Sequence, residues 1–196
     1  MYPDGTVTDN NGAIVGSADK NGNFKPATEQ EEVDFRVWKA NGGEGSFAVW
    51  KNSGKPLDRK LEVTGVSSKR PFNPENAGGA IQEMDYRNVK IDHDGIKEVE
   101  LHTKRFEKFE PNDLMKERLR KIADGEIEPT EYDLKYYSHE RRELVRYRNI
   151  GIPDNVDPGY EVWNDAHTAT LEDYGLADRD INGNSTLYHP DTWGLM

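Results

Sequence analysis

The chain has 196 residues and no cysteine. A disulfide framework, a thiolate metal site and a cysteine nucleophile are therefore excluded. Hydrophobic residues are also scarce, at 34% of the chain against 32% charged residues, and no stretch approaches the roughly 18 apolar residues of a membrane-spanning helix. We expect a soluble protein of one or two domains, whose four Trp, nine Tyr and six Phe supply the core.

Several signatures that identify enzyme classes are missing as well. The sequence has no Walker loop, no Gly-x-Ser-x-Gly elbow and no dinucleotide-binding glycine motif. Without cysteine it also lacks a zinc site of the deaminase type. Its first residues, MYPDGTVTDNNG, lack the basic and apolar blocks of a signal peptide. We therefore expect no secretory address in the chain itself.

Acidic residues are in excess, and the formal net charge is −11. The excess is uneven along the chain. Residues 51–150 carry 21 Lys and Arg against 20 Asp and Glu, whereas the remaining residues carry 5 against 17. A polyanionic substrate is compatible with this near-neutral, arginine-bearing middle. A mosaic of solvated surface charge explains the same pattern, so both interpretations stay open.

The sequence predicts a β-rich lead over residues 1–45 and a second domain over residues 46–196. Asp-Gly and Asn-Gly pairs separate short extended pieces in the first 26 residues, which favours a small β meander. A short helix is expected over residues 27–38. Strands are expected over residues 46–51 and 57–66.

From residue 94 the apolar residues follow a helical period. Helices are expected over about residues 94–109, 112–123, 130–149 and 159–174, with an irregular tail after them. The third helix would begin at a capping box formed by Thr130 and Asp133. The predicted fold class is α+β, in which a small N-terminal β meander and strands precede a mainly α-helical C-terminal domain of about four helices.

The third predicted helix carries the main candidate site. Its apolar stripe is expected to contain Leu134, Tyr137, Leu144 and Val145. A second stripe, nearly opposite, contains His139, Arg142, Glu143 and Arg146. An imidazole, a carboxylate and two guanidinium groups can together cleave a phosphodiester by general acid–base chemistry. Solvated salt-bridge surface is the alternative interpretation of this stripe.

The same helix invites comparison with a zinc-peptidase signature. In His139-Glu140-x-x-Glu143, a glutamate stands where His-Glu-x-x-His has its second histidine. A metal site would then need further ligands, such as His167 or His189. We therefore assign no residue as a metal ligand and make no firm prediction of a cofactor. A bound divalent metal ion stays an alternative.

Two further histidines are candidates for catalysis. His102 lies on the apolar face of the first predicted helix, and His167 lies beside aromatic residues on the fourth. Partial burial would lower the pKa of His167 and provide a neutral base. Both histidines could equally be satisfied core residues.

Several segments between about residues 80 and 190 resemble the C-terminal toxin tips of bacterial polymorphic toxins. Such tips occur in contact-dependent inhibition proteins, filamentous-haemagglutinin-like adhesins and Rhs-type effectors. The lead over residues 5–24 is similar to segments that precede such tips. The matching segments are residues 89–96, 102–106, 112–119, 129–133 with 139–143, 163–174 and 187–190.

This resemblance implies an antibacterial effector domain that is delivered into a neighbouring cell through a parent polypeptide or secretion apparatus. The domain would act in the target cytoplasm and be neutralised in the producer by a cognate immunity protein. Many such tips are nucleases, so the leading hypothesis is a nuclease that cleaves RNA. Its expected acid–base pair is His139 and His167, oriented by Glu143, with His102 in reserve and Arg105, Arg142 and Arg146 as phosphate clamps.

Two other functions stay open at this point. One is a metal-dependent hydrolase or peptidase that uses His139 and Glu143. The other is a non-enzymatic adaptor or immunity-type protein whose acidic flanks bind a basic partner.

Overall fold

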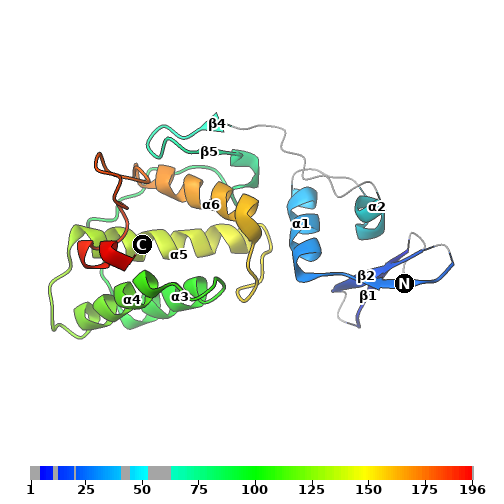
Figure 1. Ribbon diagram of the computed structural model, residues 1–196, viewed down its shortest axis with the longest axis horizontal. Helices are drawn as coiled ribbons and strands as arrows, with labels where there is room; N and C mark the ends of the chain where they lie inside the picture. The colour runs from blue at the N-terminus through cyan, green and yellow to red at the C-terminus, as the bar shows by residue number, and fades with distance from the viewer. Residues whose placement is uncertain (1–4, 11–12, 20, 41–44, 53–62, 196) are drawn as a thin grey trace. The chain divides into compact units, whose positions relative to one another are not determined.

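A computed structural model describes residues 5–10, 13–19, 21–40, 45–52 and 63–195. The chain divides into two compact units, residues 1–60 (unit 1) and 61–196 (unit 2), and each is described by itself (Figure 1). Unit 1 contains β1 (Thr6–Thr8), β2 (Ile14–Ala18), β3 (Phe24–Pro26), α1 (Glu29–Ala40) and α2 (Phe47–Asn52). Unit 2 contains β4 (Val63–Thr64), β5 (Pro71–Phe72), the 3₁₀ helix η1 (Pro74–Asn76), α3 (His93–Thr103), α4 (Glu110–Ala123), α5 (Glu131–Asn149), α6 (Gly159–Asp173) and the 3₁₀ helix η2 (Pro190–Leu195).

The predicted α+β class is confirmed. In unit 1 the strands form an antiparallel meander in the order β1-β2-β3. Asp19 shapes the turn before β3, because its carboxylate accepts the backbone N–H groups of Asn21 and Asn23. In unit 2, residues 63–195 contain the four α-helices α3 to α6.

The strand predicted over residues 46–51 is wrong, because this segment forms helix α2. Phe47 and Trp50 lie three residues apart and are both fully buried. This spacing places them on one helical face, where both contact Phe35 of α1. Of the strand predicted over residues 57–66, only Val63–Thr64 is a strand among the described residues, and residues 57–62 lie outside them.

The helix predicted over residues 94–109 ends earlier, at Thr103. Glu110-Pro111 does not end that helix but begins α4, where proline in the first turn costs no hydrogen bond. Thr130 and Asp133 form the predicted capping box at the start of α5. The core of unit 2 lies between α3, α4 and α5 and contains Val99, Met115, Leu119, Tyr136 and Tyr137, all fully buried.

Helix α5 is buried on both predicted stripes, since Tyr137 and Leu144 of the apolar stripe are inaccessible and so is most of the polar stripe. His139, Glu143 and Arg146 are almost completely inaccessible, whereas Val145, predicted in the apolar stripe, is 41% exposed. Helix α6 packs on α5. The loop after η1 also packs on α5. Gly78 of that loop has φ +72°, and a Cβ there would collide with the backbone of Arg146. The loop can therefore pack directly against α5.

The two compact units divide after residue 60, so α2 belongs with the meander. The boundary predicted from the sequence, between a lead over residues 1–45 and a domain over residues 46–196, stays a prediction. Among the described helices, none combines the length and hydropathy that a bilayer-spanning segment needs.

Candidate functional site

A cavity of about 340 Å³ lies within unit 2. Three helices contribute ionisable side chains to its wall: His102 from α3, Glu140 and Glu143 from α5, and His167 from α6. All four residues are buried. The cavity therefore places titratable groups from three helices around a space large enough for a small part of a substrate.

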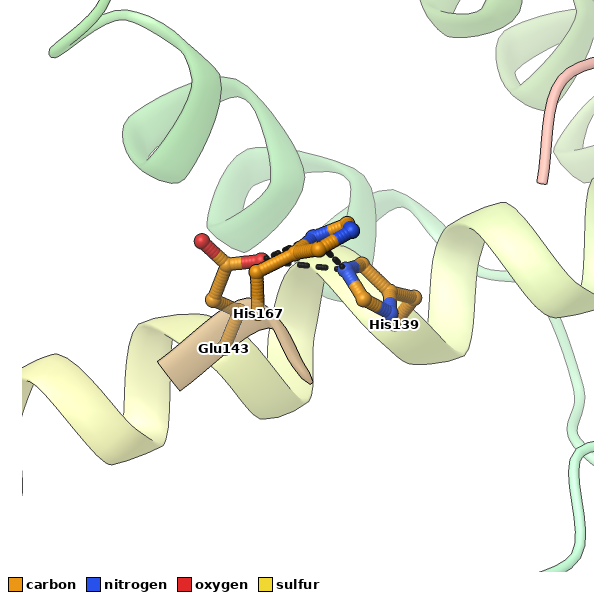
Figure 2. A group of neighbouring side chains, drawn as sticks. All are labelled: His139, Glu143 and His167. Atoms are coloured by element: carbon orange, nitrogen blue, oxygen red, sulfur yellow. Dashed lines mark hydrogen bonds and ion pairs between the residues drawn. The ribbon is translucent and has the colours of Figure 1, made fainter. Parts of the chain in front are cut away.

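His139, Glu143 and His167 meet at one point (Figure 2), and Glu143 and His167 also belong to the cavity wall. His139 Nε2 lies 2.9 Å from His167 Nδ1 and 3.0 Å from Glu143 Oε2. The third distance, from His167 Nδ1 to Glu143 Oε2, is 3.2 Å. His139 and Glu143 share one face of α5 because they are four residues apart, and α6 brings His167 onto that face.

Tyr147 and His102 extend the cluster. The Tyr147 hydroxyl donates a 2.6 Å hydrogen bond to Glu143 Oε1. His102 stacks on the Tyr147 ring, and its Nε2 lies 3.3 Å from Glu140 Oε2 and 3.7 Å from Glu143 Oε1. Each oxygen of Glu143 therefore has partners, and His102 and Glu140 form a second pair on the cavity wall.

The second ring nitrogen of His167 faces an ion pair formed by Asp178 and Arg70. His167 Nε2 lies 3.7 Å from Asp178 Oδ1, and Arg70 Nη1 donates a 2.9 Å hydrogen bond to Asp178 Oδ2. Trp163 stacks on the His167 ring, and the Arg70 guanidinium lies over the face of Trp163. These contacts hold the orientation of the imidazole.

The two glutamates of the cavity have opposite pKa shifts. Burial and the neighbouring Glu143 raise the pKa of Glu140 to about 8. Burial alone would also raise the pKa of Glu143, but hydrogen bonds with His139 and His167 hold it well below its usual range. At neutral pH, Glu143 is therefore ionised and Glu140 is mostly protonated.

The pKa values of the three histidines are also shifted in opposite directions. Burial lowers the pKa of His102 to about 4 and also lowers the pKa of His139. Burial opposes the charge on His167 too, but its contacts with Asp178 and Glu143 raise its pKa to about 9. Groups with pKa values pushed apart in one cavity are typical of acid–base sites.

The structure brings four of the predicted site residues together, namely His102, His139, Glu143 and His167. Arg142 and Arg146 lie elsewhere. Both donate hydrogen bonds to Asp173 Oδ2 of α6, at 2.7 Å from Arg142 Nε and 2.6 Å from Arg146 Nη2. Neither contributes to the wall of the cavity.

Arg105, another predicted phosphate clamp, also has protein partners. Its Nε donates to the carbonyl oxygen of His102, and its Nη1 donates to the carbonyl oxygens of Pro153 and Val156. Its guanidinium lies over the ring of Tyr147. Arg105 thus supports the cluster from behind Tyr147.

Sequence reasoning missed Glu140, Arg70, Asp178 and Tyr147 as members of the site. Glu140 had a usable signal, since it follows His139 in the segment compared with a zinc-peptidase signature. Asp178 and Arg70 lie in irregular segments, where no periodicity could place them. Arg70 is 108 residues from the aspartate it pairs with.

The donor atoms of His139, Glu143 and His167 all lie close enough together to hold a metal ion. The adjacent pair of His102 and Glu140 can exchange protons with a molecule in the cavity. Comparison with protein-family models, curated proteins and solved structures finds no significant match to this chain.

Proposed function

We propose that the helical unit is the toxin domain of a bacterial polymorphic-toxin effector and that it cleaves RNA phosphodiesters in its cavity. The observation that supports an enzyme is the convergence of His102, Glu140 and His167 on one cavity wall. The support for the toxin role is the resemblance of residues 80–190 to polymorphic-toxin tips. That resemblance also implies a cognate immunity protein as partner and delivery into a target cell.

His102 and Glu140 are the proposed proton-exchanging pair. Their side chains lie 3.3 Å apart, and both face the cavity. In RNA cleavage, one group takes the proton of the attacking 2′-hydroxyl while the other protonates the leaving 5′-oxygen. The 2′-oxygen then bonds to phosphorus as the bond to the 5′-oxygen breaks.

Arg70 is the proposed contact for the phosphate. It lines the cavity, in contrast to Arg142 and Arg146. Its guanidinium is held by Asp178 and by Asn164 Oδ1, which accepts a 2.8 Å hydrogen bond from Nη2. A guanidinium fixed in place can stabilise the charge that develops on phosphorus oxygens without reorganising.

Induction of the full chain in bacteria tests this function, with two histidines of α3 as a matched pair. We expect growth arrest and degraded RNA with the wild type. His102→Gln should abolish both effects, because this residue is buried on the cavity wall. His93→Gln should behave as wild type, since His93 lies at the exposed start of the same helix and contacts Asp124.

Circular dichroism of the purified variants checks that they are folded. A folded His102→Gln variant that still arrests growth would overturn the role of His102. A harmless wild-type chain would favour the adaptor or immunity alternative.

A metal-dependent peptidase is the second candidate, and the cluster of His139, Glu143 and His167 favours it. It predicts growth arrest with intact RNA and DNA. The same induction experiment separates the two candidates once total nucleic acid is extracted from the arrested cells.

A further inference from the structure

We propose that His139, Glu143 and His167 bind one divalent transition-metal ion, with Zn²⁺ as the first candidate. This site goes beyond the proposed function, and binding does not depend on RNA being the substrate. Two imidazole nitrogens and one carboxylate oxygen form a ligand set used by zinc hydrolases. Mg²⁺ and Ca²⁺ prefer oxygen ligands alone, so the two imidazoles favour a softer ion.

The distances between the three donor atoms fit this ion. They form a triangle with edges of 2.9, 3.0 and 3.2 Å. Ligands at about 2.0–2.1 Å from a tetrahedral ion lie about 3.3 Å from one another. The triangle therefore needs to open by only a few tenths of an ångström on binding.

Hydrogen bonding alone accounts poorly for this triangle. An imidazole nitrogen in one protonation state is either a donor or an acceptor. If the facing nitrogens of His139 and His167 both carry protons, they repel each other across 2.9 Å. If only one carries a proton, the other nitrogen and Glu143 Oε2 are two acceptors 3.2 Å or less apart. A cation at the centre satisfies all three atoms at once.

The contacts around His167 and Glu143 match those that orient metal ligands. His167 presents Nδ1 to the triangle while Nε2 faces Asp178, and Arg70 holds that aspartate. Tyr147 binds the Glu143 oxygen that points away from the triangle. A carboxylate behind a ligating histidine fixes its tautomer and raises its basicity.

The site also has access to a substrate. Glu143 and His167 line the cavity, together with His102 and Glu140. Three protein ligands and one open position are characteristic of catalytic zinc, whereas structural zinc has four protein ligands. A bound ion would there polarise a water molecule or a phosphate oxygen.

Titration of the purified full chain with Zn²⁺ after treatment with a chelator tests the site. Calorimetry should show one Zn²⁺ per chain. Binding should weaken by about 100-fold or more in His139→Gln and in His167→Gln, which lose a ligand. Tyr147→Phe, which removes only an outer contact, should weaken binding by about 10–100-fold.

His189→Gln is the matched control, because His189 is the other distant histidine that the sequence offered as a ligand. It contacts Asp191 and lies outside the triangle, so its variant should bind Zn²⁺ as the wild type does. Co²⁺ should give the visible absorption of a tetrahedral site in the wild type and in His189→Gln.

Absence of stoichiometric Zn²⁺ and Co²⁺ binding by the wild-type chain would overturn the site, and so would unchanged binding in folded His139→Gln and His167→Gln variants. These outcomes are separate from those for the proposed function. Zn²⁺ binding without RNA cleavage contradicts the nuclease alone, whereas RNA cleavage by a chain that binds no metal contradicts the metal site alone.

Discussion

Helix α5 contributes to two buried polar clusters that differ in how well they are satisfied. On one side, Arg146 donates hydrogen bonds to Asp173, to Ala77 and Gly79 carbonyl oxygens at 2.7 and 2.8 Å, and to Ala169. On the other side, the Nδ1 atoms of His102 and His139 are buried without a hydrogen-bond partner among the described residues.

This difference indicates that the two clusters on α5 have different roles. A buried charge whose hydrogen bonds are all made holds the surrounding elements in place. Buried polar atoms that lack partners cost stability, and an ordered water, an ion or a catalytic role can account for them. The contrast indicates that the arginine cluster holds the fold together, and it favours the histidine cluster beside the cavity as the proposed functional site. Substitutions in α5 test this division and the packing of the helix, and the metal and growth experiments complement them.

The largest effect is expected from Arg146→Ala. Without the Arg146 side chain, Asp173 would keep one fewer guanidinium partner. The carbonyl oxygens of Ala77 and Gly79 would lose their donors and face an unfilled space. Breaking a buried ion pair by removing one partner costs about 3–5 kcal/mol. Hydrogen exchange of the α5 amides under increasing denaturant measures this loss.

An equal loss of stability in His139→Ala would contradict the comparison. The histidine cluster should tolerate substitution better, because its partners are fewer. Growth inhibition should be lost in His139→Ala while the chain remains folded by circular dichroism.

A pH-dependent effect of intermediate size is expected from Glu140→Gln in the metal-free chain. Burial and Glu143 raise the pKa of Glu140 to about 8 from a usual 4.5. The folded chain therefore binds this proton more tightly than the unfolded chain does, and stability is lost as the pH rises from about 4.5 to about 8.

Glutamine cannot ionise, so the variant should lack this loss and gain stability relative to wild type as the pH rises. Denaturation midpoints at pH 5 and pH 8, with a chelator present, provide the measurement. A difference between variant and wild type that is the same at both values would show that Glu140 titrates normally.

The smallest effect is expected from Val145→Ala. Val145 is exposed, so its truncation should change stability by no more than about 0.5 kcal/mol. Its neighbour Leu144 is fully buried and is the matched control, with an expected loss of about 2–5 kcal/mol on Leu144→Ala. Similar losses in both variants would support the apolar stripe predicted from the sequence over the observed one.

Local signals predicted much of the framework. Asp-Gly and Asn-Gly pairs predicted the meander, and the Thr130 capping box predicted where α5 begins. These features depend on neighbours within a few residues, which the sequence displays directly. The strand predicted over residues 46–51 failed because its aromatic residues are arranged for a helix that packs on α1.

The candidate site was predicted in part. His139 and Glu143 share a helical face whatever packs on it, so their proximity followed from spacing. That His102 and His167 join them depends on the packing of α3 and α6 against α5, which no local pattern encodes. Arg70 and Asp178 were missed for the same reason.

The sequence by itself determined the absence of thiol chemistry, the helical period after residue 94 and the stripe of His139, Arg142, Glu143 and Arg146. Only the tertiary structure decided that this stripe is buried and that it divides between two clusters. The physical reason is that burial is a property of what packs against a helix. Asp173 lies opposite the arginines and His167 lies opposite His139. These polar side chains could leave water because partners from α6, from the loop after η1 and from α5 itself meet them there.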